Sequence, residues 1–145
     1  MPVLLFGIAM RAMPLSGTHG AEHQVVHAIE RGEPLTPEVV RRMPRVHPRC
    51  GTNFAAGMSL FLLLFTWRWT PDDELRLLVA ALVTLFFWRP IGAVLQQWVT
   101  TKRPTDRQLA GAIRGGEELL RKFALADRQN HSPLNRIWQS GMPMV

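Results

Sequence analysis

The chain has 145 residues and a formal net charge of +6, and 47% of its residues are hydrophobic. This length allows one domain of ordinary size, and a single cysteine excludes an internal disulfide. Nucleic-acid binding is not expected, because it calls for aromatic side chains interleaved with a basic face. The tryptophans here stand instead at the ends of apolar blocks, where membrane-interface anchors belong.

The first third of the chain predicts two helices and a loop. Ser16-Gly17-Thr18 is typical of a helix entry, and we expect a helix over about 19–31 with Thr18 as its cap. Thr36-Pro37 starts a short second helix, because a capping threonine precedes a proline at the first helical position. Pro44 ends that helix, so residues 45–52 are expected to form a loop.

Two apolar blocks follow and predict a helical hairpin in a membrane. The first, Phe54–Trp67, is short for a membrane span. Thr70 and Pro71 open the second, which is expected to run from Asp72 to Trp88. Arg89-Pro90 is expected to kink or break it before Ile91–Val99.

The two ends of the chain carry weaker signals. Thr105-x-x-Gln108 resembles a capping box and predicts an amphipathic helix to about Ala126, weakened by Gly115-Gly116. The tail from Asp127 onward has no clear period, and His131 within it is interpreted as a surface residue. Met1–Met10 is apolar but too short to span a bilayer, and we interpret it as an interfacial or re-entrant segment.

The charges beside the hairpin predict its orientation. Basic residues flank both outer ends, namely Arg41, Arg42, Arg45 and Arg49 before it and Lys102, Arg103 and Arg107 after it. By the positive-inside rule both termini then lie in the cytoplasm. The predicted fold is all-α and a single domain, 1–145, with a metal-site segment (1–52), two membrane helices (53–99) and a cytoplasmic C-terminal helix and tail (100–145). The alternative is a soluble helical protein with two buried apolar helices.

Histidines and carboxylates gather on the first predicted helix. At the helical period, His19, Glu22, His23, His27 and Glu30 share one stripe. Imidazole and carboxylate together suit zinc, iron, manganese or nickel. His19 and His27 lie about 12 Å apart along the axis, so one ion can use His23 with either of them but not with both. The alternative is a solvated polar helix face.

His19-Gly20-Ala21-Glu22-His23 also matches the H-x-x-E-H pattern of the inverzincins. In that pattern two histidines bind zinc and the glutamate activates water, so Glu22 is the candidate general base. A five-residue pattern is weak evidence, and the distant carboxylate ligand of that family has no clear counterpart here.

His47-x-x-Cys50 is the second chemical element and resembles half of a zinc knuckle. A His–Cys pair also suits a cysteine nucleophile with its base, and Cys50 can equally be a small buried hydrophobe. We favour metal ligation, because the histidine-rich helix lies near in sequence. The predicted ligands are His19, His23, His47 and Cys50, with His27 and Glu30 as alternates and zinc as the first choice among divalent transition metals.

The same residues resemble a bacterial family. His19 to His23, followed by His27 and Glu30 and then by His47-Pro48-Arg49-Cys50-Gly51-Thr52, look like the signature of the YqhQ-like proteins, and residues 96–120 look like that family's C-terminal element. Its members are bacterial integral membrane proteins described as predicted metal-dependent enzymes. The resemblance implies a metal and the bacterial inner membrane, and the positive-inside rule puts the metal site on the cytoplasmic side. This chain departs from it in lacking the glycine-rich N-terminal region and further membrane segments of longer members.

We therefore expect a membrane-attached enzyme of hydrolase type, in which Glu22 acts on a metal-bound water. Catalytic zinc keeps an open position, so one of the four predicted ligands must then stay off the ion, and His19 is the least supported. The alternative is a non-catalytic membrane subunit or assembly factor whose metal braces the fold. The expected partners are the lipid bilayer and another membrane protein, which would approach through Gly57, Ser59 and Gly92.

Overall fold

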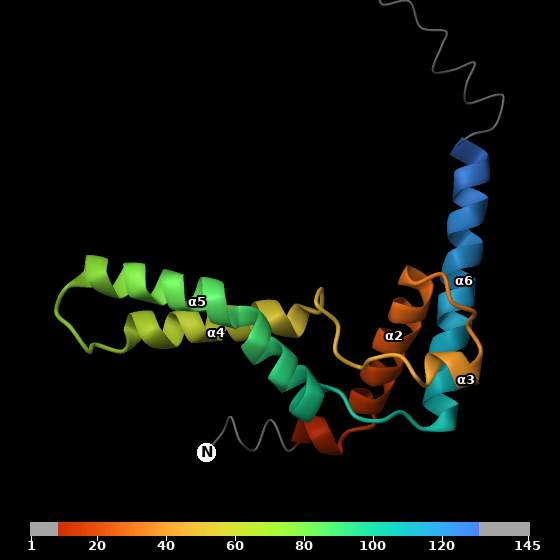
Figure 1. Ribbon diagram of the computed structural model, residues 1–145, viewed down its shortest axis with the longest axis horizontal. Coiled ribbons are helices and arrows are strands. Elements are labelled where there is room, and N and C mark those ends of the chain that lie inside the picture. Colours follow the sequence, from red (N-terminus) through yellow and green to blue (C-terminus); the bar gives the residue numbers. More distant parts are fainter. Residues whose placement is uncertain (1–8, 131–145) are drawn as a thin grey trace, which may run out of the picture.

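The computed structural model describes residues 9–130, which form helices joined by short connections and contain no strand (Figure 1). The predicted all-α class is confirmed. The elements are α2 (Leu15–Glu30), α3 (Pro37–Val40), α4 (Gly51–Thr66), α5 (Asp73–Leu95), the π-helix η1 (Gln96–Thr100) and α6 (Asp106–Asn130).

Helices α2, α3 and α6 pack into one unit with a small apolar core. Its buried side chains are Ala21, Val25, Ala28, Val40, Leu109 and Ile113. The predicted starts of α3 and α6 are confirmed: Thr36 precedes Pro37 as the N-cap, and Thr105 and Gln108 form a capping box. In that box, the Thr105 N–H donates to Gln108 Oε1 at 2.9 Å and the Gln108 N–H donates to Thr105 Oγ1 at 3.3 Å.

Helix α2 begins four residues earlier than its predicted start. Its N-cap is Pro14, and Thr18, the predicted cap, lies inside the helix. The extra turn is held from outside: the Lys102 N–H donates to the Ser16 carbonyl at 3.0 Å. A sequence pattern cannot register this support, because Lys102 is remote in the chain.

Gly20 allows the chain after η1 to lie directly against α2. A Cβ atom at this position would stand 2.5 Å from the carbonyl oxygen of Lys102. That distance is shorter than any real contact between these atoms, and backbone cannot move aside as a flexible side chain can. The glycine therefore places Thr100 and Lys102 beside the histidine-bearing face of α2.

Helices α4 and α5 lie side by side and extend away from the α2–α3–α6 unit (Figure 1). Helix α4 begins at Gly51 rather than at Phe54, because Cys50 caps it and its sulfur accepts a hydrogen bond from the Thr52 N–H at 3.4 Å. The cap of α5 is Asp72, which accepts from the N–H groups of Glu74 and Leu75.

The sequence predicted that Arg89-Pro90 would kink or break the second apolar helix, and α5 is not broken there. Pro90 lies inside the helix, and α5 changes direction in its second half (Figure 1). Helix α6 likewise continues past Ala126 to Asn130, with Gly115 and Gly116 inside it. Gly116 lies against Val25 of α2, so this glycine serves close packing.

The interpretations of His131 and of most of Met1–Met10 concern residues outside the described range 9–130. So does most of the predicted tail, whose first residues, 127–130, belong to α6.

One helical stretch in the described part of the chain is long and apolar enough to cross a membrane: residues Asp73–Thr100, with only 11% of its most apolar window buried. Helix α4 is apolar but shorter. Many of the large side chains of this helix pair face outward, among them Phe54, Leu63, Leu85 and Phe86. This is the surface expected of helices that contact lipid or another apolar partner.

We predict that Gly20→Ala lowers the free energy of unfolding by about 1–3 kcal/mol, because the added methyl overlaps backbone. Gly111→Ala is the matched control in α6, where a Cβ atom meets nothing within 4 Å. Gly111→Ala should stabilise the folded protein by about 0.4–1 kcal/mol, because alanine reduces the conformational entropy of the unfolded chain. Thermal denaturation in detergent measures both, and equal midpoints for the two variants would contradict the close approach of residues 100–102.

Candidate metal centre

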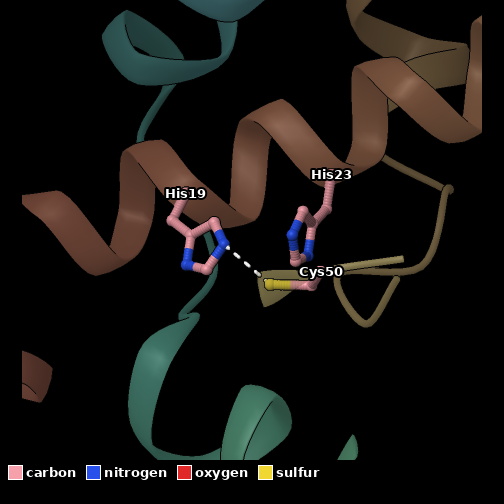
Figure 2. A group of neighbouring side chains, drawn as sticks. All are labelled: His19, His23 and Cys50. Carbon is pink, nitrogen blue, oxygen red and sulfur yellow. Dashed lines mark hydrogen bonds between the residues drawn. The ribbon is translucent and has the colours of Figure 1, made fainter. Parts of the chain in front are cut away.

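One face of α2 and the loop before α4 bring together three side chains of the types that bind metals. His19, His23 and Cys50 each offer a ligand atom, and these atoms all lie within 4.8 Å of one another. Figure 2 shows both imidazoles projecting from α2 toward the Cys50 thiol. Cys50 Sγ lies 3.4 Å from His19 Nε2. Two ligands of one tetrahedral zinc ion lie about 3.5 Å apart, given typical Zn–N and Zn–S bond lengths.

Backbone carbonyls fix which nitrogen of each imidazole is free. His19 Nδ1 lies 3.1 Å from the Thr100 carbonyl oxygen, and His23 Nδ1 lies 2.5 Å from that of Arg45. A carbonyl only accepts, so each Nδ1 carries the proton and each Nε2 keeps its lone pair. Metal-binding histidines in proteins are oriented by the same kind of hydrogen bond from the nitrogen that does not bind the metal.

A second group lies directly beside the first. His27, Glu30 and His47 each offer a ligand atom, again all within 4.8 Å of one another. His47 is the member of the second group that also lies near the first: its ring centroid is 4.8 Å from that of His27 and 5.7 Å from that of His23. The side chain of Glu30 also pairs with Arg49.

The loop that carries His47 and Cys50 is held by two buried amides. Gln96, which is fully buried, accepts from the His47 N–H at 2.8 Å and donates to Asn53 Oδ1 at 2.8 Å. Asn53 in turn donates to the Pro48 carbonyl at 2.8 Å. The two helices approach closely at this level, since a Cβ atom at Gly92 would overlap the backbone of Asn53.

The π-helix η1 supplies both Gln96 and Thr100 to this region. A π-helical turn holds one more residue than an α-helical turn, and such turns are frequent at functional sites. Here the turn places the Gln96 amide against the loop and the Thr100 carbonyl against His19.

Burial keeps the first group ready for a cation. The pKa of His23 falls from 6.5 to about 4, chiefly because the ring is buried; the Arg45 carbonyl opposes the shift, and His19, His47 and His27 add to it. The pKa of Glu30 is lowered even though its desolvation acts the other way, because hydrogen bonds from His47 and Arg49 favour the carboxylate. Around neutral pH the described site therefore offers a neutral imidazole at His23 and an ionised Glu30.

The predicted ligands are thus divided between two groups. His19, His23 and Cys50 lie together, whereas His47 joins the alternates His27 and Glu30. Glu22, the candidate base, belongs to neither group. It is exposed and lines the groove between α2 and α6, together with Val26 and Gly115.

Sequence reasoning missed the groups that orient the site. The carbonyls of Arg45, Val46 and Thr100 leave no trace in a residue pattern, because any residue supplies a carbonyl. Asn53 and Gln96 did leave a signal, since each is an amide at the edge of an apolar block. That signal pointed equally to a membrane-interface residue.

Comparison with known proteins identifies a family for this chain but finds no similar solved structure. Residues 15–88 match a family described as "Protein of unknown function (DUF1385)". The chain is 32% identical to "Uncharacterized protein YqhQ" of Bacillus subtilis (strain 168) over 145 aligned positions, covering 82% of this chain and 44% of that protein. The chain thus spans less than half the length of this relative. No solved structure matches it.

We predict that Gln96→Leu loosens the loop, because it leaves the His47 backbone N–H and the side-chain oxygen Oδ1 of Asn53 without partners. Each buried unpaired group costs about 1–3 kcal/mol. Gln97→Leu is the control, since Gln97 is adjacent in sequence and its side chain makes no hydrogen bond to the loop. Hydrogen–deuterium exchange of the peptide spanning residues 47–53 should be faster only in Gln96→Leu. Equal exchange in both variants would show that the amide does not hold the loop.

We also predict that His23 stays neutral well below the usual pH of histidine titration. Its pKa in the folded protein, about 4, lies below the ordinary 6.5. Between these values the unfolded chain binds the proton first, so the contribution of His23 to folding is complete above pH 6.5 and is lost as the pH falls toward 4. Carbon NMR of the histidine rings in metal-free protein measures this. A His23 signal that titrates near 6.5 would contradict the burial of its ring.

Proposed function

The chain belongs to the DUF1385 family, and we propose that it is a membrane-attached, metal-dependent enzyme of hydrolase type. His19, His23 and Cys50 hold the ion. The observation that carries the proposal is the convergence of these ligands with both Nδ1 atoms already bonded to carbonyls. An arrangement of this kind favours metal binding, because the Nε2 lone pairs are in place before the ion arrives.

The donor set favours zinc. Two imidazoles and one thiolate match the softness of zinc and the ligands of known catalytic zinc sites. Cys50 also caps α4, where the positive end of the helix dipole favours an anionic ligand.

Three protein ligands leave a fourth position for water, and this is what favours catalysis over a structural role. Zinc held by these three residues would supply Lewis-acid activation of a bound water, whose pKa falls to about 7 in zinc enzymes. Glu22 as the general base remains a proposal from the sequence pattern. Its position in the α2–α6 groove lends it no support.

The helix pair is the proposed membrane anchor. Residues Asp73–Thr100 extend about 42 Å at the helical rise, enough for a hydrocarbon layer of about 30 Å, whereas α4 extends about 24 Å. The mostly exposed apolar surface of both helices supports contact with lipid along most of their length. The site lies where α4 begins and η1 ends, so it would sit at one membrane surface.

Positive charge at this end of the pair supports the cytoplasmic side of the bacterial inner membrane. Arg45 lies near Arg11 and Arg103, and its pKa is lowered by burial and by these two charges. Clustered arginines beside membrane helices are typical of the cytoplasmic face. The second predicted partner, another membrane protein, gains no support from Gly57 and Gly92, since both already face side chains of the helix pair itself.

The proposal predicts stoichiometric metal in protein purified in detergent. His23→Ala and Cys50→Ala should each remove the ion from this site, because each deletes one of only three ligands. Glu22→Gln is the control and should retain it. Elemental analysis in parallel with circular dichroism measures metal content and helical fold. Metal that is absent from the wild type, or unchanged in both ligand variants, would contradict the site.

A further measurement separates an enzyme from a subunit with a structural metal. In protein loaded with cobalt, azide binds an open coordination position and changes the visible absorption of the ion. We expect that change, because the three-ligand site leaves such a position. A spectrum that azide leaves unaltered would favour the alternative, a membrane subunit or assembly factor braced by its metal.

A further inference from the structure

The His27, Glu30 and His47 group lies outside the site proposed above, and it has three ligand-type side chains of its own. Its three ligand atoms all lie within 4.8 Å of one another, as in the first group. None of the three residues belongs to that group. An ion bound there would therefore use no ligand of the first site.

Both groups are built in the same way. Each takes two residues from α2, His19 with His23 in one and His27 with Glu30 in the other. Each takes its third residue from the loop before α4, which supplies Cys50 to the first and His47 to the second. The spacings of three and four residues place side chains on one face of a helix, so α2 presents the two pairs in succession along its axis.

The imidazoles of the second group are also oriented by backbone. His27 Nε2 lies 2.9 Å from the Val46 carbonyl oxygen, so Nε2 carries the proton and Nδ1 is free. The Arg49 N–H donates to His47 Nδ1 at 3.2 Å, which leaves His47 Nε2 directed at Glu30, 3.2 Å from Oε1. His47 is 5% exposed, and a buried imidazole beside a carboxylate and a second imidazole is a typical ligand arrangement.

We propose that His27, Glu30 and His47 bind a second divalent transition metal ion beside the first. The ligand chemistry differs between the two groups: the first includes a thiolate, whereas the second has two imidazoles and a carboxylate. Such a nitrogen–oxygen set suits zinc, manganese, iron or nickel. In the metal-free protein, the Arg49 guanidinium balances the charge of Glu30, and the His47 ring nitrogen Nε2 donates a hydrogen bond to the same carboxylate. An ion bound at His47 Nε2 would take over that role, and the neutral ring would keep its single proton by moving it to Nδ1, which then gives up the hydrogen bond from the Arg49 N–H.

Cobalt titration tests this, because only a cobalt–thiolate bond gives an intense near-ultraviolet charge-transfer band. In the full chain in detergent, we expect two cobalt ions to bind while the band saturates with one. Glu30→Gln should lower the total to one ion and keep the band. Cys50→Ser should abolish the band and also keep one ion.

Arg49→Gln is the matched control for the ion pair that Glu30 makes. It removes the cation that competes for the carboxylate, so two ions should still bind and the ion that gives no band should bind more tightly. His27→Gln provides a second ligand variant in case Glu30→Gln fails to fold by circular dichroism, and it too should lower the total to one.

Three results would overturn the second site. They are a wild type that binds one ion and gives the band, two ions retained in both Glu30→Gln and His27→Gln, and loss of all cobalt in Cys50→Ser. A different result would overturn the first site alone: a wild type that never gives the charge-transfer band but binds one ion that depends on Glu30. Failure of the two proposals is therefore distinguishable.

Discussion

Gln96 accepts a buried hydrogen bond from the His47 N–H and donates one to Asn53 Oδ1, and the candidate site depends on these two contacts. They connect the π-helical turn after α5 to the loop and to the start of α4, which lie 49 and 43 residues earlier in the chain. Hydrogen bonds at the Arg45 and Val46 carbonyls tie the loop to α2, and the Gln96 amide ties it to the helix pair. An amide suits this place because it donates and accepts at once, so every partner is satisfied in a region shielded from water.

The same framework accounts for the chemistry that α2 presents. A row of imidazoles on an exposed helix face would rotate freely and take up protons near pH 6.5, the ordinary pKa of histidine. Here the carbonyls of residues 45, 46 and 100 each hold one ring nitrogen. Ligands ordered in advance lose little conformational entropy on binding, and this favours affinity for an ion of matching size. The helix pair then places this constellation at one end of a long apolar surface.

Much of this organisation could be predicted from the sequence, because it depends on local patterns. The all-helical class, the short helix after Thr36 and the capping box at Thr105 follow from caps and hydrophobic spacing. The histidine-rich face of α2 and its link to the His47–Cys50 loop also followed from residue types. The start of α2 did not, since contact with Lys102 extends the helix.

The division of the ligands into two groups was beyond the sequence for a similar reason. The direction in which the loop crosses α2 decides whether His47 lies beside His23 or beside His27, and buried amides set that direction. The position of Glu22 could not be predicted either. A helical wheel shows which residues share a face of α2, but not which other helix packs against that face. Packing of α6 against α2 places Glu22 in the groove on that side.

The central claim is that Cys50 and the histidines of α2 bind metal together. Zinc X-ray absorption spectroscopy of the purified full chain tests it most directly, since it reports the atoms bonded to the ion. We predict a sulfur shell at about 2.3 Å together with a histidine nitrogen shell at about 2.0 Å, and loss of the sulfur shell in Cys50→Ser. A spectrum of oxygen and nitrogen neighbours alone in the wild type would contradict the account.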